Sequence, residues 1–478
     1  MYTTIENDTI CAVSTPSGVG GIAVVRVSGP EAIGITDRIW RGKSLREAAS
    51  HTAHLGEIVE EGSNDEPLDQ AVATVFRGPN SYTGEDVVEL SVHGSRWIQR
   101  ELVNLLIRTG CRLAEPGEFT RRAFASGRLD LAQAEAVADV IASSSRSAHR
   151  LASSQMRGVI SKNISALRDE LIRIASLLEL ELDFSEEEVE FASREELMRM
   201  AEELLRRISG LAYSFSTGNA IKEGVPVAIV GEPNVGKSTL LNRLLNDNRA
   251  IVSDIPGTTR DTIEDTVEID GVMYRFIDTA GIRQTDDMVE SMGIERTLGA
   301  VGRARIVVWI VTPDVTADDF KLLATDLLSH LPEDAKMIVA VNKIDKINGA
   351  DKTAAGSVDM VANSEIVQEI LPANTKVVYI SAANDVNIDE LEKSLRVLSG
   401  ADDGTEADMI VTNARHYEAL VHARESLLRV IDGIQSGISG DFIAQDLRET
   451  IHHLGTITGT ITTTDILTSI FQNFCIGK

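Results

Sequence analysis

The chain has 478 residues, 43% of them hydrophobic, which is enough for roughly three domains with packed cores of their own. Its formal net charge of −27 argues against broad nonspecific binding to RNA, because lysine and arginine normally displace the counterions of a polyanion. The longest apolar stretch, residues 306–311, is far shorter than the roughly 20 residues that span a bilayer, and no charged-then-apolar leader opens the chain, so we expect a cytoplasmic protein with no membrane association.

The first part of the chain, residues 1–119, is predicted to form an α+β domain. Strand-like runs cover residues 10–14, 22–27, 70–76 and 87–92, and a helical pattern covers residues 96–108. A basic cluster follows at Arg121, Arg122 and Arg128. Such clusters are typically solvated helix faces, and contact with RNA is the alternative.

Helical periodicity begins at residue 129 and flanks a segment of a different kind. It lasts for about 80 residues and resumes after an acidic linker, residues 401–408. The later helical runs are residues 417–431, 443–454 and 466–474. The simplest arrangement is one all-α domain made from residues 120–219 and 400–478, with an α/β domain of residues 220–399 inserted into it. We therefore expect a multidomain fold with α+β, all-α and inserted α/β parts.

The inserted segment contains a phosphate-binding loop, residues 231–238, with the sequence Gly-Glu-Pro-Asn-Val-Gly-Lys-Ser. It follows a strand-like run, residues 225–230, and precedes a helix-like run, residues 239–246. In such a loop the glycines let backbone N–H groups point at a phosphate, Lys237 reaches the β- and γ-oxygens, and the Ser238 hydroxyl ligates Mg²⁺. A glycine-rich turn without a ligand is the alternative. The pattern predicts binding of a nucleoside triphosphate.

Later motifs indicate which nucleotide is bound. Asp278-Thr279-Ala280-Gly281 follows a strand-like run, so its carboxylate can hold Mg²⁺ through water and Gly281 can approach the γ-phosphate. Asn342-Lys343-Ile344-Asp345 follows another, and an aspartate there accepts hydrogen bonds from N1–H and the amine of guanine, which adenine cannot provide. Ser381-Ala382-Ala383 resembles the loop whose backbone N–H meets the guanine carbonyl. The predicted ligand is therefore GTP.

Residues in the phosphate-binding loop, in the loop 253–261 and after the motif 278–281 suggest how hydrolysis is activated. Ile282 stands where Ras-like enzymes place the glutamine that orients water, so water must be positioned some other way. Asn234 and the two threonines Thr258 and Thr259 resemble the potassium-dependent GTPases that work as dimers. That resemblance implies Mg²⁺ held by Ser238 and Thr259, and K⁺, in place of an arginine finger, held by Asn234, Ser253, Ile255 and Thr258. An Asn234 that only caps its loop, with Arg260 supplying charge, is the alternative.

The residues expected to contact GTP are Asn234, Val235, Gly236, Lys237, Ser238, Thr239, Ser253, Asp254, Ile255, Pro256, Gly257, Thr258, Thr259, Asp278, Thr279, Ala280, Gly281, Asn342, Lys343, Asp345, Ser381, Ala382 and Ala383.

Motifs along nearly the whole chain resemble the bacterial tRNA uridine-modification GTPases known as the MnmE or TrmE family. They are residues 79–86, 112–119, 129–136, 257–261, 278–283 and 474–478. The resemblance implies a K⁺-dependent GTPase, activated by dimerisation, with Lys237 and a water-positioning Glu290 as catalytic residues. With a flavin-dependent subunit that carries FAD, in a heterotetramer, it would add an aminomethyl-type group to C5 of the wobble uridine of certain tRNAs. A ribosome-associated regulatory GTPase without modification chemistry is the alternative.

The same resemblance implies a second site for a tetrahydrofolate derivative, in its 5-formyl or 5,10-methylene form. Its expected ligands are Arg26, Glu89, Arg128 and Lys478, although relatives often carry lysine at the position of Arg128. Cys475 is a candidate nucleophile if the end of the sequence docks in a structured pocket, and is otherwise inert. With Cys11 and Cys111 it completes a set of three cysteines without zinc spacing, which argues against a disulfide framework.

Overall fold

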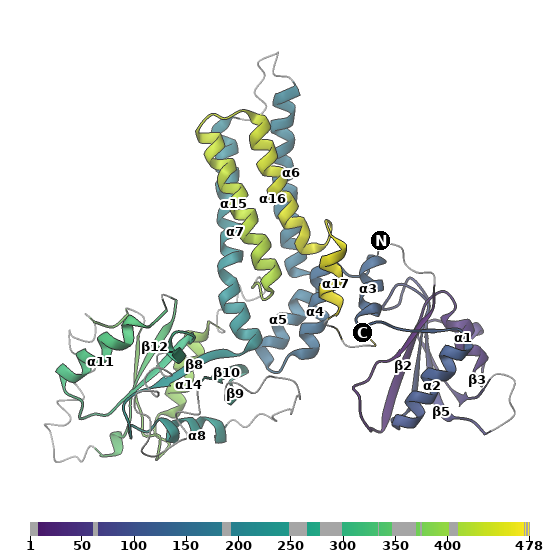
Figure 1. Cartoon of the computed structure of the whole chain (residues 1–478), viewed down its shortest axis with the longest axis horizontal. Coiled ribbons are helices and arrows are strands. Elements are labelled where there is room, and N and C mark those ends of the chain that lie inside the picture. Colours follow the sequence, from purple (N-terminus) through teal and green to yellow (C-terminus); the bar gives the residue numbers. More distant parts are fainter. Residues whose placement is uncertain are drawn as a thin grey trace. The chain divides into compact units, whose positions relative to one another are not determined.

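The computed structural model describes residues 8–60, 66–183, 193–247, 265–277, 299–332, 334–346, 370–372, 375–400, 410–472, 474 and 477. The chain divides into two compact units. The first contains Met1–Ile141, Ser154–Arg206 and Ala419–Lys478, and the second contains Ala142–Ser153 and Arg207–Glu418. Figure 1 traces both units along the sequence.

The first unit contains a seven-stranded sheet in the order β3-β4-β5-β6-β2-β1-β7. Its strands are β1 Ile10–Val13, β2 Ile22–Ser28, β3 Trp40–Arg41, β4 Thr52–Ile58, β5 Asp69–Phe76, β6 Val87–His93 and β7 Arg112–Leu113. All pairs are antiparallel except β1 with β7. Two helices, α1 (Ala32–Arg38) and α2 (Arg96–Thr109), supply Ile35, Leu102 and Leu106 to the sheet's core, with the short helix η1 (Leu45–Glu47) beside them. This is the predicted α+β fold.

The helices expected for the all-α part come from two distant stretches of the sequence. They are α3 Glu118–Ala125, α4 Leu131–Ala142, α5 Arg146–Met156, α6 Val159–Asp183, α7 Arg194–Glu223, α15 Ala414–Gln435, α16 Gly440–Thr458 and α17 Thr464–Gln472. Apolar residues spaced three and four apart on α6, including Leu167, Leu171 and Ile174, are buried. Helix α6 packs along α16, so segments far apart in the sequence share one helical core (Figure 1).

The second unit contains a six-stranded sheet in the order β13-β12-β11-β8-β10-β9. Its strands are β8 Val225–Val230, β9 Asp265–Ile269, β10 Val272–Phe276, β11 Ile306–Val311, β12 Lys336–Val341 and β13 Lys376–Tyr379. Only β9 is antiparallel to its neighbour. Helices α8 (Lys237–Asp247) and α14 (Ile388–Ser399) contribute to one core, and α11 (Ala317–Ser329) contributes to another, where Phe320 stacks on Trp309 at 4.6 Å. The α/β expectation is confirmed.

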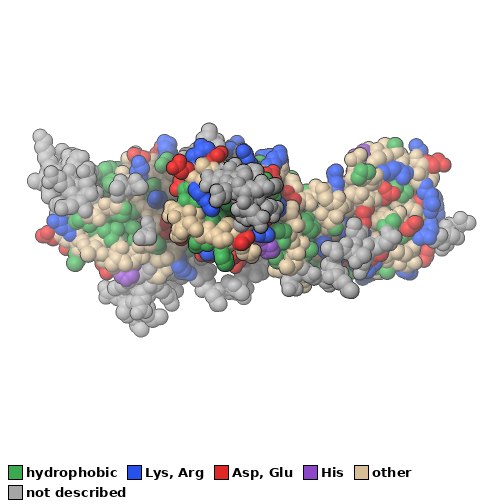
Figure 2. Space-filling model, turned by 90° about the horizontal axis from the view of Figure 1, so that it is seen from above, with side chains coloured by type: hydrophobic (Ala, Val, Ile, Leu, Met, Phe, Trp, Pro, Cys, Tyr) green, Lys and Arg blue, Asp and Glu red, His purple; other side chains and the backbone are tan. Residues whose placement is uncertain are grey.

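The described residues also give facts about hydropathy, surface charge and the cysteines. Within the described residues, no helix has the length and hydropathy needed to cross a membrane. Acidic and basic side chains lie interspersed on the face seen in Figure 2. Cys11 and Cys111 are both buried and free.

Candidate functional site

The phosphate-binding loop joins β8 to α8 and has the backbone shape that its glycines permit. Gly231, Asn234 and Gly236 have φ angles of 150°, 61° and 107°, of which the first and last suit glycine best. A Cβ atom at Gly236 would collide with the side-chain amide of Asn342. The phosphate-binding loop can therefore approach the loop that follows β12, where Asn342 lies, only with glycine at position 236.

Lys237 is held at the first turn of α8 by two backbone carbonyls. Its Nζ donates hydrogen bonds to Gly231 O at 2.7 Å and Glu232 O at 2.8 Å. Burial lowers the pKa of Lys237, and the charge of Glu232 opposes that shift. An ammonium group that has lost part of its hydration gains most from an anion, so the chemistry of this position fits a phosphate.

Asn342 connects the phosphate-binding loop to the loop after β13. Its Nδ2 donates to Val235 O at 2.7 Å, and its Oδ1 accepts from the N–H of Ala382 at 3.0 Å. Asn342 is almost fully buried. The N–H of Ala382 was one of those expected to meet the guanine carbonyl, and here it donates to Asn342. A bound guanine would have to share or replace that hydrogen bond.

Two further contacts draw the same loops together. Lys343, which has a φ of 66°, donates from Nζ to Asn234 O at 2.5 Å. The Ser381 hydroxyl donates to Asp345 Oδ1 at 2.5 Å and so fixes the carboxylate expected to read guanine. Three motifs spread over about 150 residues of the sequence thus meet at the carboxyl ends of parallel strands, the usual ligand-binding edge of such sheets.

Some of the expected site residues lie outside the part of the chain that the structure describes. Those outside the described residues are Ser253, Asp254, Ile255, Pro256, Gly257, Thr258, Thr259, Asp278, Thr279, Ala280, Gly281, Glu290, Cys475 and Lys478. Asn234, the one expected K⁺ ligand that is described, is exposed.

Two of the expected folate ligands are cross-strand neighbours on adjacent strands of the amino-terminal sheet. Arg26 on β2 and Glu89 on β6 are directly paired in register, with Nε and Nη2 at 2.9 and 2.8 Å from Glu89 Oε1. The guanidinium of Arg26 lies 5.1 Å from the ring centre of Tyr82 and 5.6 Å from that of Phe119. Arg128 is exposed, and its stem lies beside Gly84 in the loop that carries Tyr82. Three expected ligands therefore come from adjoining elements.

Phe471, Phe474 and Gly477 pack against this same part of the first unit. Phe471 and Phe474 share a core with Leu131 and Leu467. The Ser14 hydroxyl donates to Gly477 O at 3.1 Å, next to the strand pair β1 and β2. Cys475 itself lies outside the part of the chain that the structure describes, and its role stays a prediction.

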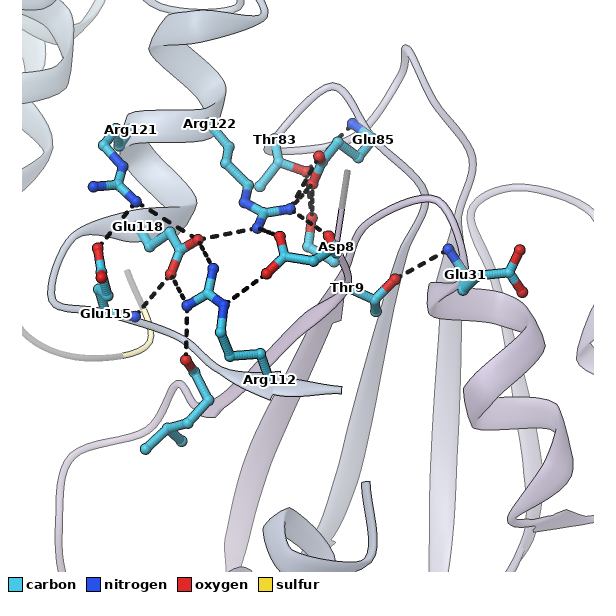
Figure 3. Close-up of polar contacts among 12 residues, drawn as sticks. Asp8, Thr9, Glu31, Thr83, Glu85, Arg112, Glu115, Glu118, Arg121 and Arg122 are labelled. Atoms are coloured by element: carbon cyan, nitrogen blue, oxygen red, sulfur yellow. Dashed lines mark hydrogen bonds and ion pairs between the residues drawn. The ribbon is translucent and has the colours of Figure 1, made fainter. Parts of the chain in front are cut away.

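A network of ion pairs beside the loop of Tyr82 was missed at the sequence level (Figure 3). Arg122 contacts Asp8 at 2.6 Å, Glu118 at 3.0 Å and Glu85 at 3.1 Å, and its side chain is 6% exposed. Arg112 contacts the same Asp8 and Glu118, both at 2.6 Å. The expectation that the cluster of Arg121, Arg122 and Arg128 is a solvated helix face is wrong for Arg122, because its side chain is buried among Glu118 of the same helix and two carboxylates from distant parts of the sequence, Asp8 and Glu85.

The network favours the charged form of two of its carboxylates, Glu118 and Asp8. Burial alone would raise the pKa of Glu118, but hydrogen bonds from Arg112, the Glu115 N–H and Arg122 outweigh it, and the pKa falls below its ordinary value. The pKa of Asp8 is lowered in the same way, by Arg112 and Arg122 against burial. The network thereby ties the start of β1, the loop 79–86, β7 and α3 into one structure.

Comparisons with known proteins cover nearly the whole chain. The family model described as MnmE helical domain matches residues 131–475, and the one described as GTP-binding protein TrmE N-terminus matches residues 9–128. A protein of Parabacteroides distasonis named tRNA modification GTPase MnmE is 51% identical, over 98% of this chain and 100% of its own. A protein of the same name from Bacteroides thetaiotaomicron is 49% identical, over 99% and 100%. The crystal structure of Era with MgGDPNP and a 16S ribosomal RNA fragment aligns with 42% of this chain and 65% of its own at 29% identity, with a TM-score of 0.28.

Proposed function

The chain belongs to the MnmE family of tRNA modification GTPases, and we propose that it is a K⁺-dependent GTPase, activated by dimerisation, that modifies wobble uridine together with a flavin-dependent subunit. The coarse activity, GTP hydrolysis in tRNA modification, follows from family membership. The product proposed here is an aminomethyl-type group at C5 of the uridine in certain tRNAs. The proposed setting is the cytoplasm, and the proposed assembly is a homodimer within a heterotetramer.

The observation that supports GTP as the nucleotide is the junction made by Asn342. This side chain joins the phosphate-binding loop to the loop of Ala382, and Asp345 is fixed nearby by Ser381. We propose that Lys237 binds the β- and γ-phosphates and that Asp345 accepts hydrogen bonds from guanine. Glu290 is proposed to orient the attacking water, since Ile282 has no group that could do so.

The proposed metal ligands are Ser238 and Thr259 for Mg²⁺, and Asn234, Ser253, Ile255 and Thr258 for K⁺. The two cations would offset negative charge on the phosphates, a role that arginine fingers fill in other GTPases. Asn234 fits this role because its side chain is exposed, and its left-handed backbone with the carbonyl bound to Lys343 fixes where that side chain starts.

A tetrahydrofolate derivative is the proposed one-carbon source, held by Arg26, Glu89, Arg128 and Lys478. The residues fit such a ligand because Glu89 can accept paired hydrogen bonds from a pterin and Tyr82 offers an aromatic face beside Arg26. The ligand would supply the carbon that is transferred. Arg26 and Glu89 bind and orient it, and Cys475 is proposed to act near that site. The FAD of the partner subunit would complete the redox chemistry.

The proposed domain division is residues 1–119, 120–219 with 400–478, and 220–399. It is supported by the packing of α6 on α16, which come from the two flanks of the inserted segment.

The decisive experiment compares two activities of the purified full-length chain: GTP turnover, and modification of wobble uridine in tRNA with the flavin-dependent subunit present. Wild-type protein should perform both, while Cys475→Ser and a chain ending at Phe474 should keep GTP turnover and lose modification. Normal modified nucleosides in tRNA from a deletion strain would instead favour a regulatory GTPase.

A further inference from the structure

The second sheet carries a row of basic residues on the edge away from the nucleotide loops. Lys336 and Lys376 are the first residues of β12 and β13, and Arg305 immediately precedes β11. These three strands are adjacent and parallel, with Lys336 paired to Ile306 and Lys376 to Ile338. The N–H of Lys336 donates to Arg305 O at 2.8 Å. The nucleotide loops follow the opposite, carboxyl ends of these strands, so this row belongs to a different surface.

The row lines a pocket of about 420 Å³, a volume within the range of small-ligand sites. Thr375 lies between the basic residues, and Val397 and Leu398 of α14 form an apolar wall. None of these lining residues is acidic. Among the described residues, neither lysine side chain makes an ion pair or a hydrogen bond. Two ammonium groups therefore face the pocket without a compensating charge from the described chain.

Two hydrogen-bond donors at the pocket are also unused. Arg305 donates from Nη1 to Ser216 Oγ and from Nη2 to Thr217 Oγ1, both at 2.6 Å, which holds its guanidinium in place. Its Nε is buried and has no partner within the described part of the chain. The same is true of the Thr375 hydroxyl. Buried donors are normally satisfied, so unpaired ones at a basic pocket point to an anionic acceptor supplied from outside. Asp334 also lies near this pocket: its charge acts on Arg305, and its Oδ2 accepts a hydrogen bond from Ser216 Oγ at 3.4 Å.

We propose that this pocket is a second anion site, which binds a phosphate group. We take the phosphate group to be a phosphodiester of the tRNA backbone, and this choice of source rests on the proposed function. A free phosphate is the other source of the same chemistry. In a chain with a net charge of −27, a polyanion is most easily held where lysines such as Lys336 and Lys376 have no acidic partner among the described residues.

The test uses full-length protein saturated with GDP and Mg²⁺, so that phosphate cannot enter the nucleotide site. The double variant Lys336→Gln/Lys376→Gln is compared with a charge-matched control, Lys321→Gln/Lys393→Gln, whose lysines are exposed on α11 and α14. Binding of a fluorescent tRNA transcript is measured at several salt concentrations, and binding of inorganic phosphate is measured by ³¹P line broadening. GTP turnover is measured in parallel and should be unchanged in both variants.

The double variant should bind tRNA about tenfold more weakly at low salt, and its slope of log K against log salt should fall by about 2, one for each lysine. Unchanged tRNA binding with loss of phosphate broadening would assign the pocket to a small phosphate. If the double variant matches the control in both measurements, or wild-type protein binds neither probe, the pocket is not an anion site. If the wild-type protein does not modify wobble uridine, only the proposed function is contradicted. The phosphate measurement does not depend on that activity.

Discussion

At the scale of single residues, the proposed nucleotide site contains side chains that also hold other loops of the protein together. Asn342 is the clearest case, because both ends of its amide are engaged with loops from elsewhere in the chain. The sequence motif predicted its position beside guanine. It could not predict these bonds, since the two partners are backbone groups and any residue type would supply them.

We predict that Asn342→Ala weakens GDP binding without unfolding the chain. The change leaves the Val235 carbonyl and the Ala382 N–H without their partner, and an unsatisfied buried group costs about 1–3 kcal/mol. The expected loss is therefore about 5- to 150-fold in affinity, measured by titration with a fluorescent GDP analogue. Asn384→Ala, an exposed residue in the same loop, is the control and should bind like wild type. Equal affinity in both variants would show that the link is not needed.

The ion-pair network gives a second residue-scale prediction, on pH. The folded-state pKa values of Glu118 and Asp8 lie below their unfolded values, so their contribution to stability is present above the unfolded pKa. It is lost as the pH falls through the folded pKa. Wild-type protein should therefore show a melting transition that drops as the pH is lowered below about 4.5.

Glu118→Gln should remove much of that acid-sensitive part. Losing one partner of a buried pair costs about 3 kcal/mol, at the low end of the usual range because Arg112 and Asp8 are about one-third exposed. Calorimetry over a pH series checks this, with Glu115→Gln as the control, since the side chain of Glu115 is mostly exposed and its ion pair is with Arg121, at 3.1 Å. A variant as stable and as acid-sensitive as wild type would contradict the role given to the network.

At the scale of elements, strands rich in β-branched residues were predictable and the others were not. Residues 22–27 and 87–92 were expected and lie within β2 and β6. Strand β4 was missed because His54 and Gly56 interrupt its apolar pattern. The network was missed for another reason. Asp8 and Arg122 are 114 positions apart, and only the packing of α3 beside the sheet brings them together.

Immediately before helix α3 stands a glycine that the segment containing Phe471 and Phe474 requires. Gly117 has a φ of 67°, and a Cβ there would lie 2.8 Å from Phe471 O and 3.0 Å from Phe474 Cβ. Gly117→Ala should therefore loosen this segment, abolish wobble-uridine modification and leave GTP turnover intact. Limited proteolysis followed by mass spectrometry reports the loosening.

The chain offers a matched control for this experiment. Gly127 has a similar φ of 72°, but a Cβ there would meet nothing within 4 Å. Gly127→Ala carries the same backbone strain without the collision and should retain modification. If both variants behave alike, strain at the ends of α3 explains the effect and the contact with Phe474 does not.

At the scale of the whole molecule, we predict that hydrolysis requires K⁺ and rises with protein concentration. An ion that replaces an arginine finger must be enclosed by loops that a second copy orders, and such a finger is worth about 10³ to 10⁵ in rate. Asn234→Ala should lose most of the stimulation by K⁺ and still bind GDP. Turnover is compared in K⁺ and Na⁺ over a range of protein concentrations, and equal rates in both salts for wild type would rule the mechanism out.

The contact between Ser14 and Gly477 has a consequence for how the protein is made. The two residues are separated by 463 positions, so β1 leaves the ribosome long before the segment that packs against it exists. At roughly 5–20 residues per second, that delay is tens of seconds. The sheet that carries Arg26 and Glu89 therefore has time to fold with this surface still open. Newly made copies should pass through a period in which the phosphate-binding loop is complete while the proposed folate site is not, so the two activities would mature at different times.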